Sequence, residues 1–97
     1  MQEIVEGLQN QSPEEELCYQ IATTNWGSNP TNVVVSAYVG YNNITESVFP
    51  TNSPSVDGDV ITLSPLKNLT QGITYKIDVK FEVGSNVFEC YFRVVAV

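Results

Sequence analysis

The sequence predicts an all-β fold, a sandwich of about seven short strands in one domain that spans residues 1–97. Three observations predict it. Strand-favouring valine, isoleucine, threonine and tyrosine are abundant, and only 15% of residues are charged. Turn signals recur about every 8–12 residues, as a sandwich requires. Residues 74–83 alternate cleanly between apolar and polar side chains, which is typical of a strand with one buried face.

Residues 61–83 indicate which kind of sandwich to expect. They contain a strand, a Leu-x-x-Leu turn, a glycine and a strand that begins with a tyrosine. In immunoglobulin-like and fibronectin-III-like sandwiches, a tyrosine at the start of strand F packs inward while its hydroxyl bonds to upstream backbone. Tyr75, with Leu69 and Gly72 just before it, has this placement. We therefore predict an immunoglobulin-like or fibronectin-III-like β-sandwich.

The N-terminal quarter of the chain is predicted to hold an arm and then a strand. Residues 1–15 are polar and acidic, which favours an extended arm or a short edge strand that orders against a partner. Residues 16–26 alternate well enough to form the next strand, with Trp26 near its end as a core anchor. Residues 27–30, Gly-Ser-Asn-Pro, then form a turn.

The middle of the chain is predicted to hold three further strands separated by turns. The first of these strands, residues 32–41, has apolar residues on both faces, with Tyr41 on the same face as Val35. It is therefore expected to be covered on two sides. Asn42-Asn43 and Asp57-Gly58 are the turn signals, and a loop rich in serine, threonine and asparagine covers residues 50–54. The predicted strands are residues 32–41, 44–49 and 59–64.

The last quarter of the chain is predicted to form a hairpin. In residues 74–83 the odd positions from Tyr75 to Val83 face inward, while Lys76, Asp78, Lys80 and Glu82 face outward. Gly84-Ser85-Asn86 closes the hairpin to a final strand over residues 87–97.

The two cysteines are expected to lie on different faces. Cys90 shares a face with Phe88 and Phe92 and is predicted to be buried, whereas the apolar face around Cys18 belongs to its neighbours Leu17 and Tyr19. A disulfide between them is the less favoured alternative to one buried thiol and one exposed or interface thiol.

Charge is divided unevenly along the chain. The formal net charge is −7, and residues 1–66 hold eight acidic residues but neither lysine nor arginine. Without a basic stripe, nucleic-acid binding is not expected. No apolar run is long enough to span a membrane, and the N-terminus lacks the pattern of a signal peptide. We expect no membrane association.

Few residues are candidates for chemistry. The sequence has no histidine, so catalytic and metal sites that need an imidazole are excluded. Asp57 and Asp59 could form a carboxylate pair or a Ca²⁺ site, but flanking a glycine they are better interpreted as solvated turn residues. We predict no catalytic, cofactor-binding or metal residues. Two kinds of contact site are candidates. The run Glu14 to Glu16 is either a solvated face or an acidic contact for a basic partner. Aromatic patches are the second kind, one formed by Tyr38 with Tyr41 and the other by Tyr91 with Arg93.

The chain resembles the small immunoglobulin-like proteins encoded among phage and prophage structural genes. The matching positions are mostly core and turn residues, and they extend over nearly the whole chain: Pro13, Glu14, Leu17, Tyr19, Ile21, Trp26, Gly72, Tyr75 and Gly84. A tryptophan at the end of the first long strand, before a Gly-Ser-Asn-Pro turn, favours this group over an ordinary fibronectin-III module.

The resemblance implies a non-enzymatic structural or assembly protein of a phage or prophage particle. Its partners would be other virion or assembly proteins, with a homo-oligomer also possible, and it would pass from the host cytoplasm into the virion. The acidic N-terminal segment and exposed strand edges would dock by β-augmentation or polar contacts. The alternative is an extracellular adhesion or carbohydrate-binding module of fibronectin-III type, with its site on loops that carry Trp26, Tyr41 and Asp57.

Overall fold

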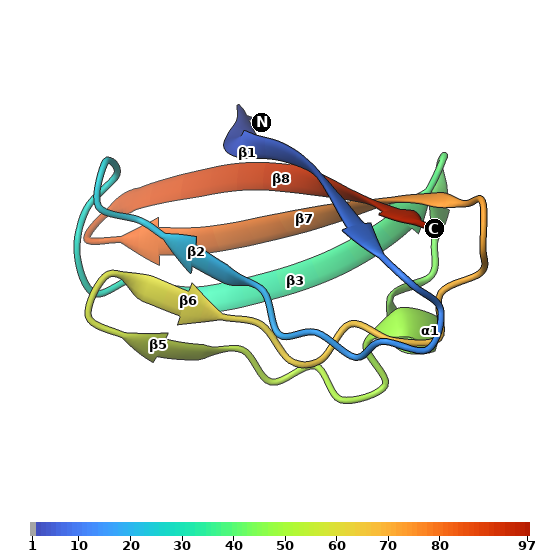
Figure 1. Ribbon diagram of the computed structural model, residues 1–97. Helices are drawn as coiled ribbons and strands as arrows, with labels where there is room; N and C mark the ends of the chain where they lie inside the picture. Colours follow the sequence, from blue (N-terminus) through green and yellow to red (C-terminus); the bar gives the residue numbers. More distant parts are fainter. Residues whose placement is uncertain (1) are drawn as a thin grey trace.

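A computed structural model describes residues 2–97, with side chains described from Leu8 onward. These residues form eight strands and one short helix, and the strands are arranged in two sheets (Figure 1). The fold is therefore all-β, as predicted. The elements in chain order are β1 (Gln2–Gln11), β2 (Gln20–Ala22), β3 (Thr31–Val39), β4 (Asn42–Asn43), α1 (Thr45–Val48), β5 (Ser55–Asp57), β6 (Val60–Thr62), β7 (Thr74–Val83) and β8 (Asn86–Ala96).

The larger sheet has the strand order β1-β8-β7-β3-β4, and the smaller has the order β2-β6-β5. All pairs are antiparallel except β1 with β8, which run parallel. The predicted hairpin joins β7 to β8 through Gly84 and Ser85, and Gly84 adopts a φ of 59°, which glycine tolerates without strain.

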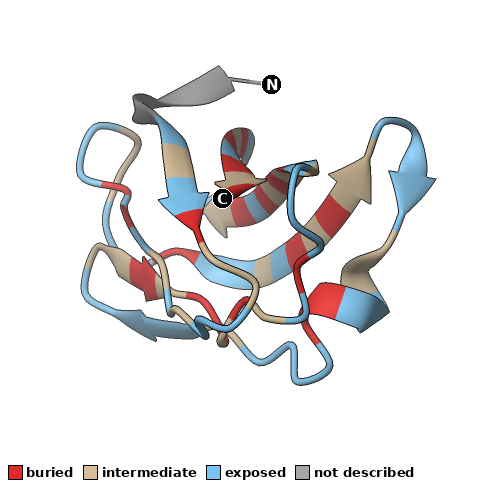
Figure 2. Cartoon of the chain, turned by 45° about the vertical axis from the view of Figure 1, so that its right-hand side comes forward, coloured by how far each residue is buried: buried red, intermediate tan, exposed pale blue. Residues whose placement is uncertain are grey.

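The core lies between the two sheets and follows from the alternation of the long strands. Along β7 and β8, buried and more exposed residues alternate, and the bands are visible on the strands in Figure 2. The predicted inward positions of β7 are buried, apart from Val83, which is half-buried at the strand end. Each sheet buries one face against the other. The largest fully buried side chains of the core are Phe49, Phe81, Ile61, Leu63, Leu66 and Ile77.

The predicted tyrosine contact is present. The Tyr75 side chain is buried, and its hydroxyl oxygen accepts a hydrogen bond of 2.8 Å from the backbone N–H of Thr70. Leu69 is buried beside this turn, and Gly72 adopts a φ of 85°. The segment that leads from β6 to β7 is therefore held to the start of β7 by the Tyr75 hydroxyl.

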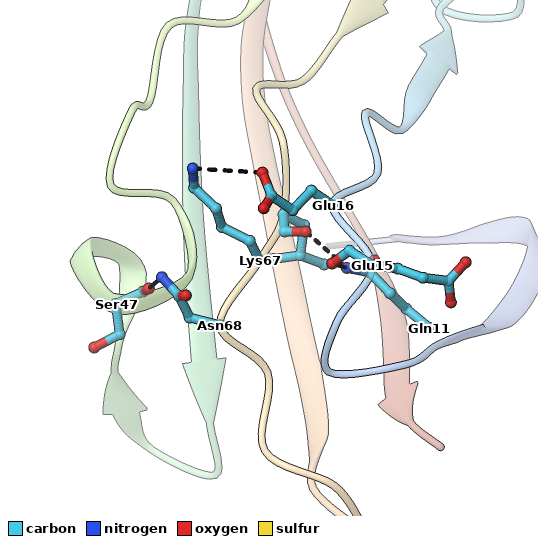
Figure 3. A network of polar contacts seen from close by, with 7 residues as sticks. Gln11, Glu15, Glu16, Ser47, Lys67 and Asn68 are labelled. Carbon is cyan, nitrogen blue, oxygen red and sulfur yellow. Dashed lines mark hydrogen bonds and ion pairs between the residues drawn. The ribbon is translucent and has the colours of Figure 1, made fainter.

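The N-terminal segment is tied to the core where it leaves β1. Gln11 is fully buried. Its amide nitrogen donates to the carbonyl of Leu66 at 2.7 Å and to that of Glu15 at 3.0 Å (Figure 3). Its amide oxygen accepts from the Tyr19 hydroxyl at 2.9 Å. Residues 2–11 form an edge strand rather than a free arm, and the strand ends on a packed polar anchor.

The strand predicted over residues 16–26 is much shorter in the structure. Only Gln20–Ala22 pair with β6, although Leu17 also forms an isolated bridge to Leu66. The chain turns at Thr23, whose backbone carbonyl accepts from the N–H of Trp26 at 2.8 Å. Trp26 still packs against the core, with its ring centroid 5.8 Å from that of Phe81.

The strand predicted over residues 44–49 is wrong, because this segment contains the helical turn α1. Val48 and Phe49 are adjacent and both buried. A strand would point two successive side chains to opposite faces, whereas a helical turn can bury both. The Asn43 side-chain oxygen accepts from the backbone N–H of Thr45, the first residue of α1, at 3.0 Å.

Two expectations for β3 are also corrected. Its outward face is open, since Val34 is 55% exposed. Tyr41 does not share the inward face, because β3 ends at Val39 and the chain reverses at Gly40, which has a φ of 60°. Tyr41 lies in the turn to β4 and is fully exposed.

Candidate protein interface

The outward surface of the larger sheet is the most distinctive exposed feature of the molecule. We call it the outer face. It is formed by side chains that alternate with the buried ones along β3, β7 and β8, together with Leu8 of β1. Its members are Leu8, Val34, Ser36, Tyr38, Lys76, Asp78, Lys80, Glu82, Val87, Glu89, Tyr91 and Arg93.

The register of the strands arranges these residues in four rows across the sheet. Three of the rows take one residue each from β3, β7 and β8 in register, whereas in the fourth the register with β3 shifts and Glu82 pairs with Thr31. There the Asn32 amide nitrogen donates to the Glu82 carboxylate at 3.1 Å. The rows are Tyr38–Lys76–Arg93, Ser36–Asp78–Tyr91, Val34–Lys80–Glu89 and Asn32–Glu82–Val87.

The outer face concentrates the cations of the protein. Three of the four basic residues, namely Lys76, Lys80 and Arg93, lie on it, together with three acidic residues. These charges cancel among the outer-face residues whose side chains are described. Along β7 the sign alternates from Lys76 to Glu82 at every outward position.

Apolar and aromatic groups are mixed with these charges. Val34, Val87 and Leu8 are 55%, 56% and 53% exposed. The ammonium of Lys76 lies 4.8 Å from the ring centroid of Tyr91, which is a cation–π contact. Tyrosines beside exposed aliphatic side chains are typical of protein interfaces, because they supply contact area and a hydrogen-bonding group at low entropic cost.

Asp78 lies in a hollow near the centre of the outer face. The hollow has a volume of about 160 Å³ and is lined by residues of β3, β7 and β8, including Tyr38 and Lys80. Asp78 Oδ1 is buried and is 3.6 Å from the Lys76 ammonium, too far for a hydrogen bond. Burial raises the pKa of Asp78, with the Glu89 charge adding to the shift and Lys76 opposing it. Oδ1 therefore has no hydrogen-bond donor among the described side chains.

The predicted acidic contact, Glu14 to Glu16, lies on the turn that follows β1. All three glutamates are exposed. The Glu15 carboxylate accepts from the backbone N–H of Ser12 at 2.8 Å, and Glu16 pairs with Lys67 at 3.6 Å, a pair shown in Figure 3. Asn68, next to Lys67, donates to the carbonyl of Ser47 in α1 at 3.0 Å. This segment is ordered by local contacts.

The residues of the alternative loop site do not come together. Trp26 and Asp57 lie near one end of the sandwich, where Asp59 beside the β5–β6 turn bonds to Thr23 and Thr24. Tyr41 is in the β3–β4 turn, next to the start of β7, while Trp26 contacts Phe81 near its end. Tyr38 and Tyr91 do share the outer face, on β3 and β8.

The cysteines lie as their positions in the sequence predict. Cys18 is exposed and Cys90 is buried, and both are free thiols. Burial raises the pKa of Cys90 to about 11, and the nearby charge of Asp78 acts in the same direction.

Among residues 8–97, whose side chains are described, the structure has no group of three or more acidic or cysteine side chains able to hold a metal ion. In the same residues, no helix has the length and apolar character that crossing a membrane requires. Comparisons with protein-family models, curated proteins and solved structures gave no match for this chain.

The sequence predicted which residues of β7 and β8 point outward, but not which residues of neighbouring strands lie side by side on the outer face. Lys76, Asp78, Lys80 and Glu82 were predicted to face outward, and each of them does. The rows depend on which β8 and β3 residues stand beside them, and register cannot be derived from alternation alone.

Proposed function

We propose that this protein is a non-enzymatic structural or assembly protein that acts through protein–protein contacts in a phage or prophage particle. The observation that carries the contact role is the outer face, where Tyr38 and Tyr91 lie among exposed aliphatic side chains and paired charges. The assignment to a particle is supported by the resemblance to small immunoglobulin-like phage and prophage proteins, which lies in core and turn residues between Pro13 and Gly84.

We further propose that the sandwich is of immunoglobulin-like type. In that type, one sheet contains strands B, E and D, and the other contains G, F, C and, in the variable form, C′. The orders β2-β6-β5 and β8-β7-β3-β4 correspond to these two sets when the strands are lettered along the chain. The hydrogen bond from Thr70 to Tyr75 supports the same assignment, because it joins the positions of the E–F corner.

A second contact route is the edge of the larger sheet. β1 is paired on one side only among the described strands, so its other side offers backbone donors and acceptors to a strand of a partner. The exposed glutamates Glu14 to Glu16 follow directly and favour a basic partner surface next to that edge.

The test is mass spectrometry of particles released after prophage induction in the source organism. We expect the chain at stoichiometric abundance beside capsid or tail proteins. Intact particles that contain those proteins but lack this chain would contradict a place in the virion. A double Val34→Asp/Tyr91→Ala variant should be incorporated poorly, whereas Tyr41→Ala, which alters an exposed tyrosine off the outer face, should be incorporated normally.

The edge route needs a separate variant. Removing residues 1–13 would also remove the buried Gln11 and so would disturb folding. Removing residues 2–7 keeps Gln11 and its bonds, so lost incorporation of this folded variant would support the edge route, and normal incorporation would exclude it.

A further inference from the structure

We propose that the outer face binds a second copy of this chain, with the two larger sheets stacked face to face and their β7 strands antiparallel. The inference rests on the proposed role of the outer face as a protein-binding surface and names its occupant. The argument for a second copy is the order of charges on β7, which is complementary to its own reverse.

The complementarity can be read directly from the strand. The two copies would be related by a two-fold axis that lies between their stacked outer faces and passes over Val79, at right angles to β7. Residue 76 of one copy then faces residue 82 of the other, and residue 78 faces residue 80. Lys76 then faces Glu82, and Asp78 faces Lys80. Each of these pairs occurs twice, so all eight outward charges of the two β7 strands meet an opposite charge.

The residues of β8 beside β7 are compatible with this arrangement. Arg93 of one copy faces Val87 of the other, and Glu89 faces Tyr91. No like charges are therefore opposed outside β7 in these rows. With the β7 strands parallel, every row would face itself, and Lys76 would meet Lys76. Like charges opposed in this way disfavour the parallel arrangement strongly.

Asp78 supplies an independent reason for a partner at the same place. Its Oδ1 atom is buried without a hydrogen-bond donor among the residues whose side chains are described, and Asp78 lines the hollow. A buried carboxylate oxygen without a donor is unfavourable. The antiparallel arrangement brings an ammonium, that of Lys80 from the second copy, to the hollow that Asp78 lines, and a rotation of the Asp78 side chain would present Oδ1 to it.

The size of the outer face is also adequate for a reversible dimer. Strands of about ten residues, spaced about 4.8 Å apart, give the sheet a flat area on the order of 500 Å² before side-chain relief is counted. Standard interfaces bury ~800 Å² of accessible surface per partner, and weak ones bury less. We therefore expect a dimer that dissociates on dilution.

The test is analytical ultracentrifugation of the purified full chain over a range of concentrations, with paired charge reversals. In the dimer, Lys80→Glu sets two carboxylates against each other at both central contacts, and Asp78→Lys sets two ammonium groups against each other there. Each variant alone should dimerise at least about 100-fold more weakly than the native chain, because opposed like charges are strongly unfavourable. An equimolar mixture of the two variants should regain association as a heterodimer. One central contact then joins the native Asp78 and Lys80 side chains, and the other joins the two substituted side chains. Both contacts pair opposite charges.

The controls are Lys67→Glu and Asp57→Lys, which make the same charge changes away from the outer face. Both should dimerise like the native chain. A native chain that stays monomeric at about 1 mM, where even a weak interface is populated, overturns the proposal. So does a mixture of the two outer-face variants that remains monomeric while both are folded by circular dichroism.

These results separate the dimer from the proposed function. A native chain that dimerises as described but is absent from particles leaves the dimer in place and removes the particle role. A monomer that is nevertheless incorporated into particles does the reverse.

Discussion

The side-chain amide of Gln11 donates a hydrogen bond of 2.7 Å to the backbone carbonyl of Leu66, and both residues are buried. This contact joins the end of β1 to the segment that follows β6, between residues 55 positions apart in the chain. It links the edge of the larger sheet to the segment that crosses back from the smaller one.

Replacing Gln11 by alanine should destabilise the fold by about 2–3 kcal/mol, because two backbone carbonyls lose a buried donor and a cavity is left. Tyr19→Phe removes only the hydroxyl that bonds to the Gln11 oxygen, so it should cost about 1 kcal/mol. Urea unfolding followed by tryptophan fluorescence measures both, since Trp26 is the single tryptophan. Equal losses for the two variants would argue against Gln11 as the anchor.

Tyr75→Phe tests the turn before β7. It keeps the buried ring but leaves the Thr70 N–H without its acceptor, so the free energy of unfolding should fall by about 1–2 kcal/mol. Tyr41→Phe makes the same chemical change on a fully exposed ring and should leave stability within about 0.5 kcal/mol of the native chain. Thermal unfolding of both variants provides the comparison.

Gly27→Ala should be more damaging than Gly58→Ala. Both glycines have positive φ angles, but a Cβ at Gly27 would lie 2.6 Å from Val83 Cγ1, whereas a Cβ at Gly58 meets nothing within 4 Å. Gly58→Ala is therefore expected to cost about 1 kcal/mol of backbone strain and Gly27→Ala clearly more. If denaturant midpoints shift equally, the β2–β3 loop does not pack on Val83 as described.

The two thiols should differ sharply in reactivity. With its pKa raised to about 11, Cys90 carries almost no thiolate at mildly alkaline pH and is also buried, whereas Cys18 is exposed. A colorimetric thiol reagent should therefore modify one group per native chain and two in denaturant. Cys18→Ser should abolish the native reaction and Cys90→Ser should leave it, and the opposite pattern would reverse the two assignments.

Asp78→Asn should alter how stability depends on pH. Because burial raises the Asp78 pKa in the folded chain, the stabilisation linked to this group is fully present below the unfolded pKa and is lost as pH rises through the folded pKa. The charged carboxylate thus opposes folding at neutral pH. Asparagine should be at least as stable as aspartate at about pH 7, with its relative advantage shrinking toward about pH 4.

Those unfolding experiments need dilute protein, in which we expect the chain to be monomeric. If Lys80 of a second copy reaches Asp78, dimerisation stabilises the charged form and reverses the preference for asparagine at neutral pH. If the difference in free energy of unfolding between the native chain and Asp78→Asn does not change with protein concentration, that result would count against the contact.

Much of the larger sheet could be predicted from the sequence because its long strands have one buried and one solvated face. The inward and outward positions of β7, the hairpin at Gly84, the burial of Cys90 and the hydroxyl contact of Tyr75 are all confirmed. In each case a side-chain pattern with period two, or a glycine at a turn, determines the local structure directly.

The remaining elements depend on contacts between distant segments. Residues 44–49 have the composition of a strand, but burial of both Val48 and Phe49 favours a helical turn. Gln11 lies in a polar stretch that indicates an extended arm or a short edge strand, and its burial depends on acceptors at Glu15 and Leu66 that no local pattern reveals. The rows of the outer face likewise depend on a register that only the assembled sheet defines.

The parallel pairing of β1 with β8 has a mechanical consequence. Because the two strands run in the same direction, a force that pulls residue 2 away from residue 97 along the strands makes β1 slide against β8. The hydrogen bonds between them lie across that direction and bear the load together, whereas in an antiparallel end pair they would open one at a time. Stretched between its two ends, this small domain should resist extension as a shear joint does.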